Sequence, residues 1–175
     1  MHFLRDALCE DHMGVINSIL VIGVGNEYRS DDGLGILAAR ELRRRNIPGV
    51  VVVEQNGEGV ALMDAWEKYD RVIIVDALDC GAASGDVHRL DAASKRIPAH
   101  FVHYSSHAFG VVEAIEMARQ LHRLPHVLLL YGIEGQQFDV GPGLTDAVLK
   151  SMPDMLSSIE SELKRMRTLP PEAHN

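Results

Sequence analysis

Short apolar runs separated by amphipathic segments are the dominant pattern along this chain of 175 residues. Each run has the length of a buried strand, which is a continuous apolar stretch of about four to eight residues. The runs that predict buried strands cover residues 19–22, 50–53, 71–76 and 127–130. Residues 86–90 alternate polar and apolar positions, and therefore predict a short strand at the edge of a sheet.

Helices are predicted between the strands, where apolar residues recur at three- or four-residue spacing. The expected helices cover residues 33–47, 60–69, 107–121 and 144–166. Ser30 or Asp31 is expected to cap the first helix, because a short side-chain oxygen accepts a free N–H of the first turn. The last helix is expected to be interrupted near Pro153, because proline lacks the N–H that an inner turn needs.

Strands that alternate with helices predict the α/β fold class. We expect a three-layer sandwich in which a mainly parallel, twisted sheet of about five strands carries helices on both faces. Residues 18–167 are expected to form one domain, since ~100–200 residues is the usual domain size. Residues 1–17 are expected to be a loosely ordered extension, and residues 168–175 a flexible tail.

The expected strand order predicts where a ligand would bind. In the common order 2-1-3, the first and third strands are neighbours, and ligands bind at the carboxyl ends of such strands. Asp32 follows the first strand and Asp76 ends the third, so two carboxylates distant in sequence meet at this crevice. An imidazole would complete a mixed oxygen and nitrogen site that suits nickel, zinc or iron better than magnesium. His107, at the start of a predicted helix, is the best candidate for this third group.

Charge and composition exclude several classes of partner. The net charge of −8 disfavours nucleic acid and anionic lipid. Two cysteines, Cys9 and Cys80, are too few for a disulfide framework or a cysteine-rich zinc site. No apolar run approaches the ~18 residues of a membrane span, and charged residues interrupt any signal-peptide pattern at the N-terminus. We therefore expect a cytoplasmic protein that binds neither nucleic acid nor membrane.

Other candidate sites match their motifs less well. His100, His103 and His107 do not have the His-Glu-x-x-His spacing of a zincin helix. Cys80 is a candidate nucleophile only if a histidine lies near it in space, and a thiol without a catalytic role is the alternative. The segment Gly-Val-Gly at residues 23–25 begins like a dinucleotide fingerprint, but Tyr28 replaces its third glycine, which disfavours dinucleotide binding.

Residues 23–35 read Gly-Val-Gly-Asn-Glu-Tyr-Arg-Ser-Asp-Asp-Gly-Leu-Gly. This stretch resembles the signature of the hydrogenase maturation endopeptidases, which is written GxGN, a short gap and D-[DE]-G-x-G. Further matches follow in the family's order, namely Asn56-Gly57, Ile-Ile-Val-Asp-Ala around Asp76, Ser106-His107 and Gly143-Leu-Thr. The resemblance covers about residues 18–165.

The resemblance implies an aspartyl-type endopeptidase that removes the C-terminal extension of a [NiFe]-hydrogenase large-subunit precursor after nickel insertion. The family's nickel-recognising residues fall on Asp32, Asp76 and His107, and the two aspartates are the expected catalytic residues. The substrate would supply the nickel, so the chain is expected to hold no tightly bound cofactor of its own and to act as a monomer. The residues expected to shape the substrate site are Gly25, Asn26, Asn56 and Gly57.

Two alternatives stay open. A non-catalytic, nickel-dependent assembly factor would bind the metal without cleaving a peptide. A peptidyl-tRNA hydrolase-like enzyme would share the Gly-x-Gly-Asn opening and a related sheet. Such enzymes continue with Pro-Gly and later a catalytic His-Asn pair, which is absent after Tyr28, and the acidic charge disfavours tRNA.

Overall fold

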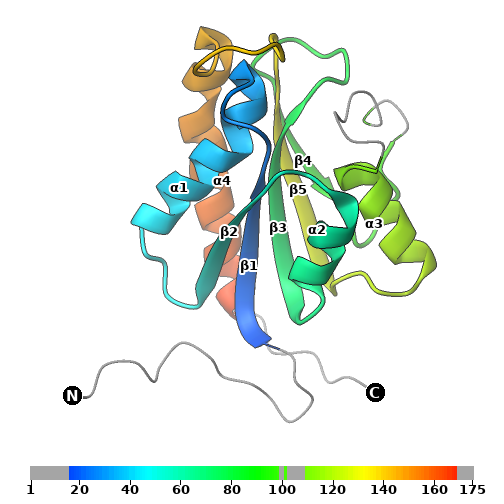
Figure 1. Cartoon of the computed structure of the whole chain (residues 1–175). Helices are drawn as coiled ribbons and strands as arrows, with labels where there is room; N and C mark the ends of the chain where they lie inside the picture. Colours follow the sequence, from blue (N-terminus) through cyan, green and yellow to red (C-terminus); the bar gives the residue numbers. More distant parts are fainter. Residues whose placement is uncertain (1–15, 99–100, 102–108, 169–175) are drawn as a thin grey trace.

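The computed structural model describes residues 16–98, 101 and 109–168, which form one five-stranded sheet between two layers of helices (Figure 1). The strands are β1 (Ile16–Val24), β2 (Val50–Gln55), β3 (Tyr69–Leu78), β4 (Val87–Asp91) and β5 (Val127–Glu134). Their order across the sheet is β2-β1-β3-β5-β4, and β4 runs antiparallel to β5 at the edge. The predicted α/β class, the mainly parallel sheet and the order 2-1-3 are confirmed.

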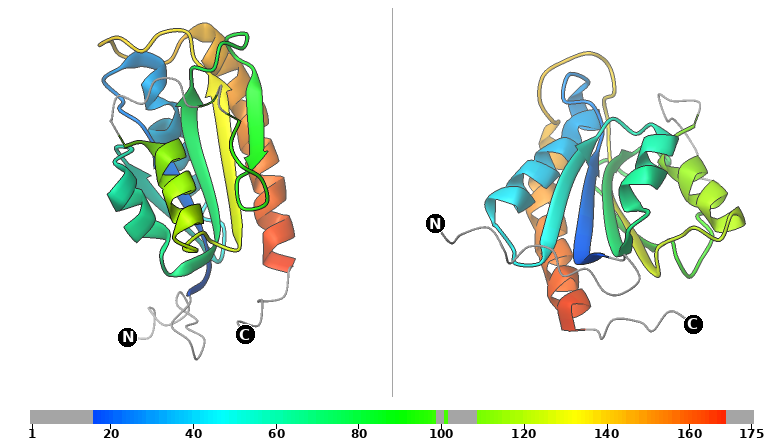
Figure 2. Two further views of the ribbon diagram at one scale, coloured as in Figure 1. Left: turned by 90° about the vertical axis from the view of Figure 1, so that its right-hand side faces the viewer. Right: turned by 60° about the horizontal axis from the view of Figure 1, so that its bottom comes forward.

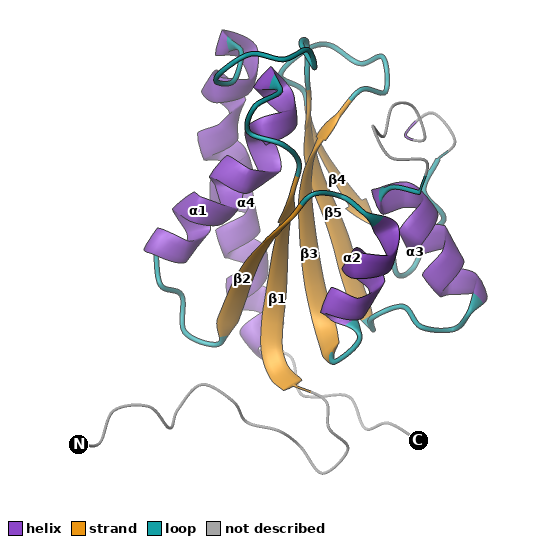
Figure 3. Cartoon of the chain, viewed as in Figure 1, coloured by secondary structure: helices purple, strands orange, loops and turns teal. Residues whose placement is uncertain are grey.

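Helices cover both faces of this sheet (Figures 2 and 3). They are the 3-10 turn η1 (Ser30–Gly33), α1 (Leu34–Arg44), α2 (Gly59–Trp66), α3 (Val111–Gln120) and α4 (Asp146–Thr168). The helices α1 and α4 pack on one face, and α2 and α3 pack on the other. Within the described part of the chain, no helix combines the length and the apolar character that a bilayer crossing requires.

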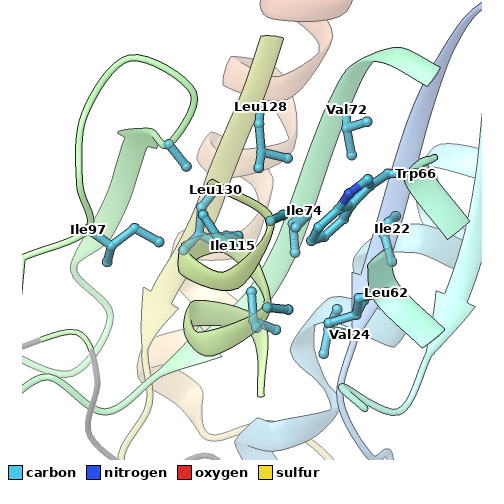
Figure 4. Packing of buried hydrophobic residues seen from close by; sticks show 14 of the residues in the cluster. Ile22, Val24, Leu62, Trp66, Val72, Ile74, Ile97, Ile115, Leu128 and Leu130 are labelled. Carbon is cyan, nitrogen blue, oxygen red and sulfur yellow. The ribbon is translucent and has the colours of Figure 1, made fainter. Parts of the chain in front are cut away.

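Alternate residues of the central strands supply the two layers of the core. In β3, Val72 and Ile74 face α2 and α3, where they pack near Trp66 of α2 (Figure 4). Ile73 and Val75 face α1 and α4. All four side chains are fully buried, because helices cover the strand on both sides. This double burial explains why the sequence of β3 is apolar at consecutive positions.

The last helix, α4, is continuous, so the predicted interruption is wrong. Pro153 lies inside the helix on its exposed side. Val148 before it and Met155 and Leu156 after it are buried against the same layer of the core. Packing on both sides of Pro153 offsets the roughly 3 kcal/mol that a proline costs in a helix interior.

The first strand begins inside the segment expected to be an extension, and the last helix ends inside the expected tail. The division into an extension, one domain over residues 18–167 and a tail stays a prediction. β1 begins at Ile16, which pairs with Tyr69 of β3, so the sheet includes two residues of the extension expected over 1–17. α4 ends at Thr168, one residue into the expected tail. The other residues of the extension and the tail lie outside the described part of the chain.

Two internal boundaries also differ from the prediction. β3 continues past Asp76 to Leu78, because Asp76 still pairs with Gly132 of β5. Asp76 therefore lies inside the strand, two residues before its end. The third predicted helix was expected to begin at His107, which lies outside the described residues, and α3 begins at Val111.

Candidate active site

The loop after β1 folds back and places Asp32 beside the end of that strand. Gly25 has a φ of 137°, a backbone conformation that side chains rarely adopt. A Cβ at this position would lie 1.8 Å from the carbonyl oxygen of Asp32. The N–H of Asn26 donates to the same oxygen at 3.1 Å. Glycine is therefore required where the chain returns so closely on itself.

Another glycine brings the start of α1 against the two central strands. A Cβ on Gly35 would lie 2.1 Å from the carbonyl oxygen of Val24 in β1 and 2.3 Å from that of Val75 in β3. The first turn of α1 therefore lies over the carboxyl ends of both strands. The preceding turn η1 carries Asp32 to the same position, where ligands bind in sheets of this order.

The acidic pair after β1 consists of a buried anchor and a partly exposed carboxylate. Asp31 is completely buried, whereas Asp32 is partly exposed. The Asp31 carboxylate accepts N–H groups from Gln136 at 2.8 Å, Gln137 at 3.1 Å and Thr145 at 2.7 Å. It also accepts the hydroxyl of Thr145 at 3.0 Å. These bonds hold the β5–α4 loop against the loop after β1, at the upper end of the sheet in Figure 1.

The predicted helix cap is wrong, because both candidate residues bond to the β5–α4 loop instead. Gly33 occupies the cap position of α1, and no side chain caps that helix. Ser30 donates its hydroxyl to the carbonyl oxygen of Asp139 at 3.3 Å, 109 residues further along the chain. Sequence reasoning missed the anchoring role of Asp31, since its partners are equally remote and leave no local pattern.

Asp76 lies near the carboxyl end of β3, on the face of the sheet that α2 and α3 cover. Burial raises the pKa of its carboxyl group well above the usual range, and the charge of Asp32 raises it further. The N–H of Ala77 donates to Oδ1 of Asp76 at 2.9 Å and partly opposes the rise. The structure thus brings Asp32 and Asp76 within electrostatic reach of each other. Two carboxyl groups in this relation favour a shared proton or a bound cation.

A cleft of about 680 Å³ opens beside Asp32, between the loops that follow β1 and β2. Of the residues expected to shape the substrate site, Gly25, Asn26 and Asn56 line this cleft. Gly57 is buried in the second of these loops with a φ of 89°, which explains the glycine there.

The two asparagines fix the loops that form the walls of the cleft. Asn26 Oδ1 accepts the N–H of Tyr28 at 3.0 Å, and Asn56 Oδ1 accepts the N–H of Glu58 at 3.2 Å. Such bonds to the backbone two residues ahead are typical of tight turns. Glu58 in turn caps α2 by accepting the N–H groups of Val60 and Ala61. Both asparagine carbonyls therefore have a structural role.

Ion pairs join the same two walls. Arg40 of α1 bonds Glu27 at 2.7 Å and Glu54 at 3.1 Å, and Arg43 bonds Glu54 at 2.6 Å. The hydrogen bond from Arg40 lowers the pKa of Glu27, and the hydrogen bond from Arg43 lowers the pKa of Glu54. These partly exposed pairs add little to stability, so their main effect is to hold the walls in position.

The Cys80 thiol does not have the character of a nucleophile. It donates to Oε2 of Glu134 at 3.0 Å. Burial and this carboxylate raise the pKa of the thiol to about 11, so it holds its proton at neutral pH. The structure therefore favours the alternative in which Cys80 is not a catalytic residue.

His107, the third member of the predicted trio, lies outside the described residues. The described residues on either side of it in sequence, Phe101 and Phe109, belong to the core layer under α2 and α3. The carbonyl oxygen of Phe109 accepts the N–H of Gly59 at the start of α2. The chain therefore enters and leaves this segment on the face that carries Asp76, and the role of His107 stays a prediction.

The fold is similar to the folds of solved hydrogenase maturation proteases. It resembles the hydrogenase maturating endopeptidase HybD from Escherichia coli, with a TM-score of 0.65 and 21% identity, over 85% of this chain and 93% of that one. It also resembles the [NiFe] hydrogenase maturation protease HybD from Thermococcus kodakarensis, with a TM-score of 0.62 and 22% identity. That match covers 83% of this chain and 99% of the other. At such identities, the likeness establishes the fold alone.

Sequence relationships establish the family. The family model described as hydrogenase maturation protease matches residues 36–162. The hydrogenase expression/formation protein HupD from Bradyrhizobium diazoefficiens is 34% identical over 128 residues, which are 67% of this chain and 62% of HupD. The hydrogenase 2 maturation protease of Escherichia coli is 26% identical over 160 residues, which are 89% of this chain and 97% of that protein. The chain belongs to the hydrogenase maturation protease family, and the resemblance drawn from its motifs is confirmed.

Proposed function

We propose that this chain is an endopeptidase that removes the C-terminal extension of a [NiFe]-hydrogenase large-subunit precursor after nickel insertion. The family supports the peptidase class and favours it over a peptidyl-tRNA hydrolase-like enzyme. The observation that carries the proposal is the coupled pair Asp32 and Asp76 at the carboxyl ends of β1 and β3. The pair lies at the position where a sheet of this order binds ligands, and the cleft beside Asp32 gives a peptide access.

Nickel recognition follows from the chemistry of the proposed ligands. Asp32, Asp76 and His107 offer two carboxylates and an imidazole, a set that a divalent transition metal accepts. The nickel is cargo of the substrate, so the three residues would complete a coordination shell that the precursor begins. A cation between the aspartates would offset the repulsion by which the charge of Asp32 raises the pKa of Asp76.

Peptide hydrolysis requires a water molecule and a base that accepts its proton. Asp32 is partly exposed beside the cleft and would accept the proton as the water oxygen attacks the scissile carbonyl carbon. The carbon–nitrogen bond then breaks, and the proton passes to the leaving amine. The described chain carries both aspartates and both cleft walls itself, which supports a monomeric enzyme.

The test is cleavage of a purified precursor in its nickel-loaded and nickel-free forms, followed by mass spectrometry of its C-terminus. We expect loss of the extension from the loaded precursor alone. Asp32→Asn, Asp76→Asn and His107→Ala should each lower the cleavage rate about 10²-fold or more, because each removes a group placed at the reacting centre. Asp64→Asn is the matched control, since this exposed carboxylate on α2 lies outside the lining of the cleft.

Three outcomes would contradict parts of the proposal. Equal cleavage of the nickel-loaded and nickel-free precursors would contradict nickel recognition. Full activity of Asp32→Asn and Asp76→Asn would contradict a catalytic role of the two aspartates. Full activity of His107→Ala would show that His107 does not belong to the site. Nickel-dependent binding of the precursor without any cleavage would instead indicate an assembly factor.

A further inference from the structure

Among the described residues, Cys80, His88 and Glu134 form a group whose potential ligand atoms all lie within 4.8 Å of one another. Cys80 follows β3, His88 lies in β4, and Glu134 ends β5. The group is separate from the aspartate pair and takes no part in the function proposed above. It combines a thiol, an imidazole and a carboxyl group, three side chains that ligate metal ions in proteins.

The register of the sheet explains why these side chains meet. His88 pairs with Gly132 in the antiparallel pair of β4 and β5. Side chains two residues apart on a strand share a face, so Glu134 points to the same side of the sheet as His88. The carboxylate of Glu134 then accepts the N–H groups of Cys80, Gly81 and Ala82 at 2.9, 2.8 and 3.1 Å. These bonds wrap the loop after β3 around Glu134 and bring the thiol to it.

His88 gives the independent indication of a ligand. Its Nε2 is buried and has no hydrogen-bond partner within the described part of the chain. Its ring packs edge-on against Phe101, with 5.4 Å between the ring centroids. Burying a polar atom without a hydrogen-bond partner lowers the stability of the folded state. In native proteins such an atom usually contacts a bound water or ion. The neighbouring thiol and carboxylate make a cation the fitting partner.

Glu134 has an oxygen placed for such an ion. Glu134 is 2% exposed, and its Oε1 accepts all three N–H groups of the loop. Oε2 accepts the N–H of Cys80 at 3.2 Å and the S–H of the same residue at 3.0 Å. The lone pair that accepts the S–H becomes available to an ion when the thiol loses its proton. In a tetrahedral zinc site, ligand atoms lie about 3.3–3.8 Å apart, given metal bonds of about 2.0–2.3 Å. Small side-chain rotations would therefore bring the three atoms into coordinating positions.

We propose that Cys80 Sγ, His88 Nε2 and Glu134 Oε2 bind a Zn²⁺ ion. Thiolate and imidazole ligands select zinc over magnesium or calcium, and the carboxylate completes a three-residue set with one position left for water. On binding, the Cys80 thiol releases its proton to solvent, and the sulfur–metal bond replaces the S–H bond. The ion fastens the loop after β3 to β4 and β5. The backbone of His88 lies two strand spacings, about 10 Å, from the backbone of Asp76.

Cobalt absorption spectroscopy of the full chain tests this site, because thiolate-bound Co²⁺ has a charge-transfer band in the near ultraviolet. We expect one equivalent of Co²⁺ to produce the band and one equivalent of Zn²⁺ to remove it. Cys80→Ser should abolish the band. His88→Gln should weaken Co²⁺ binding at least about 10-fold, because even the loss of a residue that only hydrogen-bonds to a metal ligand lowers the affinity by that much. Cys9→Ser and Asp76→Asn should both keep the band. This result would show that neither the other cysteine nor the aspartate pair binds the cobalt that produces it.

The variants Cys80→Ser and His88→Gln separate loss of the metal site from loss of the fold. Serine retains the hydrogen bond to Glu134, so circular dichroism should show Cys80→Ser folded like the wild type. Zn²⁺ should raise the unfolding midpoint of the wild type but not of Cys80→Ser. A cobalt band that survives in Cys80→Ser, or equal zinc affinities of the wild type, Cys80→Ser and His88→Gln, would overturn the proposal. Neither result depends on proteolysis, so this site and the proposed enzyme can fail separately.

Discussion

Replacing Asp31 by asparagine isolates the structural member of the acidic pair. Oδ1 of Asp31 accepts the N–H of Thr145, and Oδ2 accepts the N–H groups of Gln136 and Gln137. Asparagine places an NH₂ group at one of these positions, so at least one donor loses its acceptor. A hydrogen bond to a charged group contributes about 1.5–3 kcal/mol, and the remaining bonds weaken when the charge is lost. We therefore expect the free energy of unfolding to fall by about 2–4 kcal/mol.

Thermal denaturation followed by circular dichroism measures this loss. For a domain of this size, the expected loss of unfolding free energy lowers the midpoint of thermal unfolding by about 5–15 °C. Asp32→Asn is the matched control, since it makes the same chemical change one residue away at a partly exposed position. Its unfolding free energy should not fall at neutral pH, because the substitution removes the charge that opposes ionisation of Asp76, while cleavage is lost. Equal unfolding midpoints for Asp31→Asn and the wild type would refute the anchoring role of Asp31. A larger loss of stability in Asp32→Asn than in Asp31→Asn would also refute it.

Three further substitutions test other parts of the structure. Asp76→Asn should stabilise the protein at neutral pH. The raised pKa of Asp76 means that folding stability falls as pH rises from about 4 through the folded pKa, so the advantage should vanish below about pH 4 in urea titrations. Gly25→Ala should cost more than about 1 kcal/mol and more than Gly49→Ala, which also has a positive φ but meets nothing within 4 Å; equal losses would contradict the close contact with Asp32. Pro153→Ala should raise the free energy of unfolding by about 1–2 kcal/mol, because it restores helix propensity at an exposed position; an unchanged midpoint would show that the helix carries no proline cost.

The architecture could be predicted from the sequence because local pattern and chain topology agree. The continuous apolar run of β3 identifies a strand covered on both faces, and right-handed crossovers place it beside β1. Those two inferences suffice to bring Asp32 and Asp76 to one edge of the sheet. The structure adds what pattern cannot supply, namely that Asp76 is buried enough for its pKa to rise.

Features that depend on remote contacts could not be predicted. Capping rules favoured Ser30 and Asp31 because they consider only the adjacent helix, whereas the partners of both lie in the β5–α4 loop. Local propensity likewise places a break at Pro153, although burial on both sides of it keeps α4 continuous. The group of Cys80, His88 and Glu134 has no motif spacing, since each residue comes from a different element.

The anchoring of Asp31 has a consequence for synthesis of the protein. Its acceptor oxygens are satisfied by residues 136, 137 and 145, so β1 and the acidic pair leave the ribosome long before their partners exist. Until more than a hundred further residues have been translated, Asp31 has none of these bonds and the segment that carries Asp32 is not held in place. The nascent chain therefore cannot assemble this edge of the sheet early. The edge of the sheet that carries Asp32 is therefore complete only after residue 145 has been translated and the β5–α4 loop has reached Asp31.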